Sequence, residues 1–181
     1  MKKPLEDVTD KERQNAKAVN FGLLFAMGVP GLKKYAMDTY GVEMDLDKAQ
    51  FFRERFFNAY YGFSNWQCNQ KFETETRTIG GRRRVWYNET SELPELCNSP
   101  IQGTAADILK RALVNLDADL MGTDSRIIAT VHDEIIVEAP KKIISEAKQV
   151  IEGAMIKAGE YYLSNVPVMV DIAESHSWGG C

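Results

Sequence analysis

The order of secondary-structure signals along the chain predicts an α+β fold, with a helical lobe beside a small antiparallel sheet. Helix signals fill the first 75 or so residues, and strand signals appear only afterwards, interleaved with further helices. A length of 181 residues fits one domain or two pieces of a larger one, and a hydrophobic fraction of 44% is ordinary for a globular core. The sequence contains no internal repeat and no low-complexity linker.

Helices account for the first part of the chain. Thr9 and Glu12 have the spacing of a capping box, which marks a helix start. The first expected helix runs from near Thr9 to a stop signal at Gly28-Val29-Pro30-Gly31, and the second runs from Leu32 to Tyr40 and ends at Gly41. The third begins at a cap, Asp45 or Asp47, and continues through Phe56, and the fourth runs from about Ser64 to Thr76.

Strands and helices alternate in the second part. The segment TRTIGGRRRVWY predicts a hairpin around Gly80-Gly81, and TVHDEIIVE predicts a strand pair that meets at His132-Asp133-Glu134. The remaining expected elements are a long helix from after Pro94 to Met121 closed by Gly122, an amphipathic helix from Lys141 to about Glu160, and a last strand from Val166 to Ile172.

Composition excludes several classes of protein. No run of about eighteen apolar residues exists, and the polar start MKKPLEDVTDKERQ has no apolar signal region, so no membrane partner is expected. Cys68, Cys97 and Cys181 are widely spaced, which indicates free thiols and a cytoplasmic protein. With two histidines and no CxxC pair, a zinc site is not expected.

The charge pattern is ambiguous about nucleic acid. A formal net charge of -4 argues weakly against it. The run Arg82-Arg83-Arg84, preceded by Lys71 and Arg77, could instead form a local basic patch. An arginine run is also typical of a solvated surface turn, and composition alone leaves both interpretations open.

Arg13, Lys17 and Phe21 recur every four residues, so on a helix they lie along one slanting face. Two cations and an aromatic ring suit a ligand with phosphates at one end and a flat base at the other. Gly22 would leave room for a close approach. The alternative is a solvated basic face with Phe21 in the core.

His132, Asp133 and Glu134 interrupt two β-branched runs. A carboxylate presented where two strands meet is a hard oxygen ligand suited to magnesium, which can polarise phosphoryl oxygens. An exposed strand-joining turn with no ligand is the alternative.

Asn98 and Gln102 are also four residues apart, and small residues follow them from Gly103 to Ala106. Amides on one helix face can donate to acceptors in a DNA minor groove. Local capping or packing would explain the same pattern.

Three motifs in order resemble a known family. RQNAKAVNFGLLFAMG is similar to motif B, Arg-x3-Lys-x3-Phe/Tyr-Gly, TVHDEIIVE to motif C, and NSPIQGTAADILKRA to the helix between them. From Pro4 to Trp178 the chain resembles the C-terminal part of the polymerase domain of family A DNA polymerases, the bacterial polymerase I and phage replicative type. The resemblance implies that residues 1–92 are mainly a helical fingers subdomain and that residues 93–181 are the C-terminal part of a palm subdomain.

The resemblance also implies site residues, a cofactor and partners. Asp133 would bind Mg²⁺ in a two-ion site. The implied catalytic group is Asp133, Lys17, His132 and Glu134; the nucleotide-binding group is Arg13, Lys17, Phe21 and Phe25; the DNA-binding group is Asn98, Gln102, His132, Arg82 and Arg83. The implied partners are primer-template DNA, deoxynucleoside triphosphates and an N-terminal polymerase segment.

The sequence departs from the family pattern in several places. Motif A, Asp-Tyr-Ser-x-x-Glu-x-x-Arg, which supplies the other metal-binding Asp, is not found. Phe25 stands where the family often has Tyr, Ala26 where it has Gly, and Pro94 where it often has Arg. We therefore expect this chain alone to be inactive or nearly so. The hypotheses are a fragment of a template-directed DNA polymerase and a non-catalytic DNA- or nucleotide-binding module derived from one.

Overall fold

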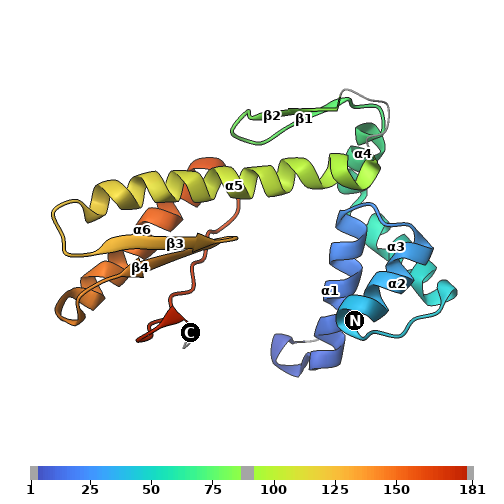
Figure 1. Ribbon diagram of the computed structural model, residues 1–181. Coiled ribbons are helices and arrows are strands. Elements are labelled where there is room, and N and C mark those ends of the chain that lie inside the picture. Colours follow the sequence, from blue (N-terminus) through green and yellow to red (C-terminus); the bar gives the residue numbers. More distant parts are fainter. Residues whose placement is uncertain (1–3, 87–91, 179–181) are drawn as a thin grey trace. The chain divides into compact units, whose positions relative to one another are not determined.

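The computed structural model describes residues 4–86 and 92–178, which form two compact units (Figure 1). The N-terminal unit comprises residues 1–76 and 83–100, and the C-terminal unit comprises residues 77–82 and 101–181. Among the described residues, no helix combines the length and the apolar character needed to cross a membrane.

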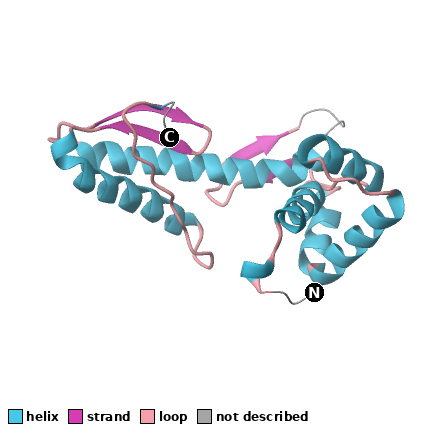
Figure 2. Cartoon of the chain, turned by 90° about the horizontal axis from the view of Figure 1, so that it is seen from below, coloured by secondary structure: helices cyan, strands magenta, loops and turns pink. Residues whose placement is uncertain are grey.

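The predicted α+β class is confirmed: helices dominate, and the strands form two separate two-stranded sheets, β1–β2 and β3–β4 (Figure 2). In chain order the elements are η1 (Leu5–Asp7), α1 (Asp10–Leu24), α2 (Val29–Tyr40), α3 (Leu46–Ala59), α4 (Tyr61–Gln70), β1 (Glu75–Arg77), β2 (Arg83–Val85), α5 (Leu93–Leu120), β3 (Arg126–Val131), β4 (Glu134–Glu138), η2 (Lys141–Ile143) and α6 (Ile144–Tyr162).

The N-terminal unit is built on α1, α2 and α3, which share one apolar core. Its buried members are Ala18, Leu23, Leu32, Ala36, Val42, Met44, Ala49 and Phe56. A Cβ at Gly22 would lie 2.7 Å from Cδ1 of Leu32, so only glycine lets α1 approach α2 this closely. Gly22 therefore permits a close approach, as expected, but what approaches it is a side chain of α2.

The C-terminal unit packs the β3–β4 hairpin on α5 and α6 (Figure 1). Leu116, Leu120 and Ala154 form its buried centre, and Ile127, Ile135 and Val137 of the hairpin cover them. The strands are antiparallel, and the pair Arg126–Glu138 closes the open end of the hairpin with a 2.6 Å ion pair. An exposed pair of this kind adds little stability, so the apolar face holds the hairpin in place.

Several predicted element ends are confirmed. Thr9 and Glu12 form the capping box of α1, Asp45 caps α3 by accepting from the Lys48 N–H at 2.7 Å, and Gly41 ends α2 with φ 62°. Gly122 follows α5 with φ 79°. These positions are predictable because each satisfies a backbone requirement that acts over only a few residues.

Other expected bounds are wrong. Helix α1 ends at Leu24, because Val29 and Pro30 form the first turn of α2, where proline is well tolerated. Helix α4 ends at Gln70 and strand β1 follows, so the expected helix to Thr76 is too long. The expected strand at residues 166–172 is absent: alternate side chains from Val168 are half-buried, yet the segment joins neither sheet.

A buried glutamine ties the C-terminal end of α1 to α4. Gln67 is 6% exposed, and its Nε2 donates to the carbonyl oxygens of Leu23 and Leu24 at 2.8 and 3.0 Å. The last carbonyls of a helix have no partner within the helix, and a buried one without a donor is costly. Gln67 removes that cost for Leu24 and gives a second donor to Leu23, whose carbonyl also accepts from the Ala26 N–H at 3.1 Å.

Ala26 adopts φ 60° in the turn after α1, a conformation that costs a residue with a Cβ about 1–2 kcal/mol. Ala26→Gly is expected to raise the free energy of unfolding by about 0.5–1 kcal/mol, measured by denaturant titration. The control is Ala16→Gly, the same change at an exposed position inside α1, which is expected to lower it by about 1 kcal/mol. A comparable fall in the free energy of unfolding in both variants would contradict the backbone strain assigned to Ala26.

Gln67→Leu keeps the size of the side chain and removes its amide. The change leaves the Leu24 carbonyl without its donor and the Leu23 carbonyl with only the Ala26 N–H, so the free energy of unfolding is expected to fall by about 1–3 kcal/mol. Asn65→Leu, at an exposed position of the same helix, is the matched control and is expected to change it by less than about 0.5 kcal/mol. Equal effects of the two changes in a urea titration would argue against the capping role.

Candidate active site

The outward face of α1 carries the first predicted group. Arg13, Lys17 and Phe21 are all exposed, while Ala18 and Gly22 on the opposite side are buried. Phe21 is 44% exposed, so the alternative that places its ring in the core is wrong. Neither cation pairs with a carboxylate of the described chain. The face therefore offers two unneutralised charges in line with an open aromatic ring.

Phe25 lies one helical turn beyond Phe21 and ends the helix. Its N–H donates to the carbonyl of Phe21 at 3.4 Å, and its side chain is half-buried. The strained backbone of Ala26 then turns the chain toward α2. The ring of Phe25 thus belongs partly to the packing of this helix end and partly to its surface.

The predicted metal group occupies the two-residue turn between β3 and β4. Val131 pairs with Glu134, so His132 and Asp133 are the turn residues, and His132 has φ 55°. Positive φ at the first position suits the twist of a tight hairpin. His132, Asp133 and Glu134 are all exposed, so the turn presents both carboxylates to solvent.

The donor chemistry of this turn fits magnesium in kind, because carboxylate oxygen is the ligand that magnesium prefers. The number of carboxylates at the turn fits a magnesium site only in part. Within residues 4–86 and 92–178, no three His, Cys, Asp or Glu side chains group closely enough to hold a metal ion. Magnesium commonly takes one or two carboxylates together with waters and substrate phosphates, so Asp133 is suited to be one ligand of a shared site.

Asn98 and Gln102 lie one turn apart on α5. Gln102 is exposed, and Asn98 is half-buried with an Oδ1 atom that has no hydrogen-bond partner. Neither amide bonds a described residue, so the alternative of local capping is not supported. Gly103 beside them does not leave open space, because a Cβ there would lie 2.6 Å from Cγ2 of Thr78.

All three arginines of the basic run have acidic partners. Arg82 pairs with Asp107 at 2.8 Å, Arg83 with Glu75 at 3.5 Å and Arg84 with Glu95 at 3.9 Å. The run is therefore less basic than its sequence indicates. A guanidinium has five N–H donors, so the half-exposed Arg82 and Arg83 retain donors for a second partner.

Arg82 also fastens the hairpin tip to α5. Its Nε donates to Oδ1 of Asp107, and its Nη2 donates to the carbonyl of Gly103 at 2.9 Å. Burial alone raises the pKa of Asp107, but hydrogen bonding to Thr78 and Arg82 and the charges of Arg82 and Lys110 outweigh it and leave that pKa below its usual value. Asp107 and Gln67 were not predicted; a polar residue at a buried helical position is the one signal that could have found them.

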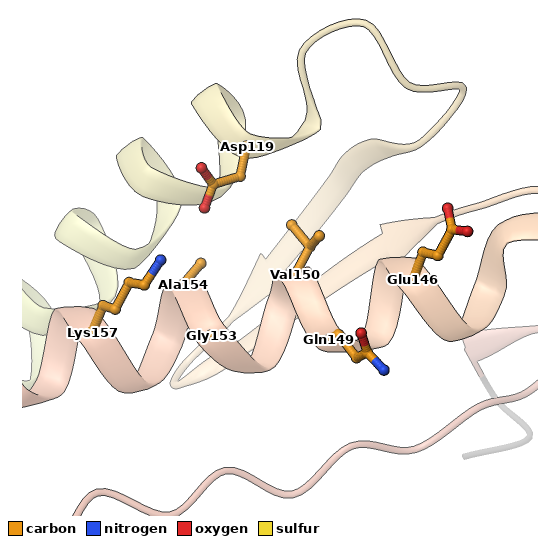
Figure 3. Close-up of a pocket in the computed structure, with 7 residues that line it drawn as sticks. All are labelled: Asp119, Glu146, Gln149, Val150, Gly153, Ala154 and Lys157. Carbon is orange, nitrogen blue, oxygen red and sulfur yellow. The ribbon is translucent and has the colours of Figure 1, made fainter.

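A hollow of about 440 Å³ lies beside α5 and α6 in the C-terminal unit (Figure 3). Its lining residues are Asp119, Glu146, Gln149, Val150, Gly153, Ala154 and Lys157. None of the predicted site residues lines it. Cys68 and Cys97 are free, as predicted, whereas Cys181 lies outside the described residues.

Comparisons with known proteins agree on one family. The model of DNA polymerase family A matches residues 1–180. DNA polymerase I of Aquifex aeolicus is 40% identical over 96% of this chain and 31% of its own length, and that of Pseudomonas aeruginosa is 33% identical over 97% of this chain and 20% of its own length. The chain thus spans less than a third of either relative.

A solved structure gives the same result. The POL domain of Pol1 from M. smegmatis, in complex with DNA primer-template and dNTP, superposes with a TM-score of 0.74 at 28% identity, over 86% of this chain and 29% of that one. A family match over nearly the whole sequence, with the same fold in a solved relative, leads to one conclusion: this chain belongs to DNA polymerase family A.

Proposed function

We propose that this chain is part of a template-directed DNA polymerase and supplies its nucleotide-binding helix and one metal-binding carboxylate. The observation that carries the proposal is the exposed Arg13-Lys17-Phe21 face of α1, because its two cations have no carboxylate partner in the described chain. Membership of DNA polymerase family A and the dNTP-bound relative support a nucleotide as the ligand of this face.

In this proposal, Arg13 and Lys17 bind the triphosphate, and the rings of Phe21 and Phe25 pack on the base and sugar. Charge-assisted hydrogen bonds to phosphate orient the nucleotide and offset its negative charge. The reaction is attack of a primer 3′-hydroxyl on the α-phosphate of a deoxynucleoside triphosphate.

Asp133 would hold Mg²⁺, with Glu134 as an accessory carboxylate and His132 beside the primer terminus. Bound magnesium would supply polarisation of the phosphoryl oxygens. The sequence carries no Asp-Tyr-Ser-x-x-Glu-x-x-Arg pattern, so a second carboxylate would come from another polymerase segment.

Primer-template DNA is the second proposed partner. Asn98 and Gln102 would donate to minor-groove acceptors, and the remaining N–H groups of Arg82 and Arg83 would reach phosphates. We further propose that residues 1–92 correspond mainly to a fingers subdomain and residues 93–181 to the C-terminal part of a palm subdomain. The two compact units divide the chain differently in detail, within the β1–β2 hairpin and inside α5.

The first test concerns magnesium. One carboxylate without substrate phosphates holds a magnesium ion weakly, so a calorimetric titration of this chain is expected to show no site tighter than about millimolar and no primer extension. Asp133→Asn, compared with Asp124→Asn at another exposed turn, is expected to change magnesium binding little in the free chain. A micromolar site that Asp133→Asn abolishes would show that the turn is complete without a second segment.

The second test separates nucleotide from DNA in an enzyme completed by a segment carrying the second carboxylate. Lys17→Ala removes a charge-assisted bond worth roughly 1.5–3 kcal/mol, so kcat/KM for nucleotide is expected to fall about ten- to a hundredfold. Primer-template affinity is expected to change far less, because many other phosphate contacts hold the duplex. Gln102→Ala is expected to weaken primer-template affinity more than it lowers kcat/KM for nucleotide.

Lys11→Ala is the matched control, since Lys11 is an exposed cation on another face of α1. It is expected to leave nucleotide kcat/KM within about twofold, because surface charges away from the ligand contribute little. An unchanged efficiency in Lys17→Ala would mean that the basic face is only a solvated surface.

A further inference from the structure

Helix α3 carries a second face of cations and rings that the proposed function does not use. Lys48, Phe51, Phe52 and Arg55 occupy positions i, i+3, i+4 and i+7, so they form one continuous stripe along the helix, called here the α3 stripe. Phe51 is 52% exposed, and Lys48 and Arg55 are exposed. Phe52 is half-buried against the core of the N-terminal unit and anchors the stripe.

The side chains of the α3 stripe contact one another in cation–ring pairs. Nζ of Lys48 lies 5.9 Å from the centre of the Phe52 ring, and Cζ of Arg55 lies 5.2 Å from the centre of the Phe51 ring. The two ring centres are 6.0 Å apart. A cation over a ring keeps its charge and gains a weak attraction to the ring, so these contacts favour the arrangement of the stripe and leave it positive.

The cations of the stripe are not neutralised by the part of the chain that the structure describes. Neither Lys48 nor Arg55 pairs with a carboxylate among the described residues, in contrast to the arginine run at residues 82–84. Glu54, which precedes Arg55, instead accepts from Gln50 at 2.6 Å. The carboxylate of Asp45 accepts from the backbone N–H of Lys48 at 2.7 Å and forms no ion pair with its ammonium group. The stripe therefore keeps two charges available for an external anion.

A ligand that fits the α3 stripe needs negative charge at intervals and flat apolar surfaces between the charges. Single-stranded DNA has both: its phosphates suit Lys48 and Arg55, and its unpaired bases can stack on the exposed ring of Phe51 or on the guanidinium plane. Duplex DNA offers the phosphates, but its base faces are already stacked inside the helix.

We infer that the α3 stripe is a binding surface for single-stranded DNA, which in the working enzyme would be unpaired template. The assignment to template rests on the proposed function, whereas binding of a single strand by the stripe does not. The arrangement of rings and cations defines a sequence-tolerant surface, because every base has a stacking face.

The test uses fluorescence anisotropy on this chain with a labelled oligothymidylate of about twelve nucleotides. Phe51→Ala is expected to weaken binding about tenfold, as loss of one base–ring stack does. The double variant Lys48→Gln, Arg55→Gln is expected to weaken binding and to reduce the slope of log affinity against log salt by about 1.4, since two phosphate contacts are lost.

Two further probes decide what is recognised. An abasic strand of the same length is expected to bind about tenfold more weakly than oligothymidylate and to be insensitive to Phe51→Ala, because it has phosphates and no bases. A blunt duplex of the same length is expected to be insensitive to Phe51→Ala as well. Equal sensitivity of duplex and single strand to this change would overturn the assignment to single-stranded DNA.

Matched control variants test whether the loss of any exposed ring or cation would weaken DNA binding equally. Phe72→Ala removes a ring that is 85% exposed elsewhere in the N-terminal unit, and Lys34→Gln removes an exposed cation of α2. Both are expected to leave oligothymidylate affinity within about twofold. Phe51→Leu, which retains apolar packing without a flat ring, is expected to fold normally and to lose the same affinity as Phe51→Ala. Unchanged binding in the two Phe51 variants would overturn the inference.

The outcome is separable from that of the proposed function. Oligothymidylate binding is measured without nucleotide, metal or a second polymerase segment, so its failure leaves the Lys17 result standing. Conversely, Phe51→Ala could weaken oligothymidylate binding while Lys17→Ala leaves nucleotide kcat/KM of the completed enzyme unchanged. That result would support the α3 stripe as a DNA-binding surface and reject the nucleotide role of α1.

Discussion

The C-terminal end of α1 is the constraint on which the N-terminal unit depends. Gln67 satisfies the carbonyls of Leu23 and Leu24, and Gly22 lets α1 pack closely on α2. Because these interactions hold one side of α1 against its neighbours, the opposite side, with Arg13 and Lys17, must face solvent. The position of the predicted ligand-binding face is thus a consequence of backbone hydrogen bonding and packing, and the charges themselves contribute nothing to placing it.

Charge pairing decides which cations of the sequence are available to an anionic ligand. The most basic run of the chain, at residues 82–84, is matched residue by residue with carboxylates, and one of these pairs fixes the hairpin tip on α5. Arg13, Lys17, Lys48 and Arg55 have no such partners in the described chain. A net charge of -4 therefore conceals unneutralised cations on α1 and α3. For a chain proposed to bind nucleotide and DNA, local pairing is more informative than the overall sum.

Sequence predicts the features that arise from short-range physics. The cap at Thr9, the helix-ending glycines at Gly41 and Gly122 and a strand-joining turn at His132 and Asp133 each depend on a few adjacent residues, and all are present. The expected turn also included Glu134, which instead belongs to β4 and pairs with Val131. Long-range partners were not predictable in this way: Gln67 bonds residues more than forty positions away, and Gly22 and Gly103 accommodate side chains of other elements. The expected strand after Val166 failed for the same reason, because alternation predicts an extended segment but cannot supply a hydrogen-bonding neighbour.

Backbone strain offers a separate argument about where chemistry takes place. Among the described residues, Ala26 and His132 are the non-glycine positions with positive φ. Such conformations cost energy and tend to persist at functional sites, where the surrounding structure imposes them. Ala26 directly follows the helix that carries Arg13, Lys17 and Phe21, and His132 directly precedes Asp133. Both strained residues therefore adjoin the segments singled out by charge and by family resemblance. Because backbone strain does not depend on ligand chemistry, it is an independent argument for the proposed nucleotide face of α1 and the proposed metal-binding turn between β3 and β4, and not for the hollow beside α5 and α6.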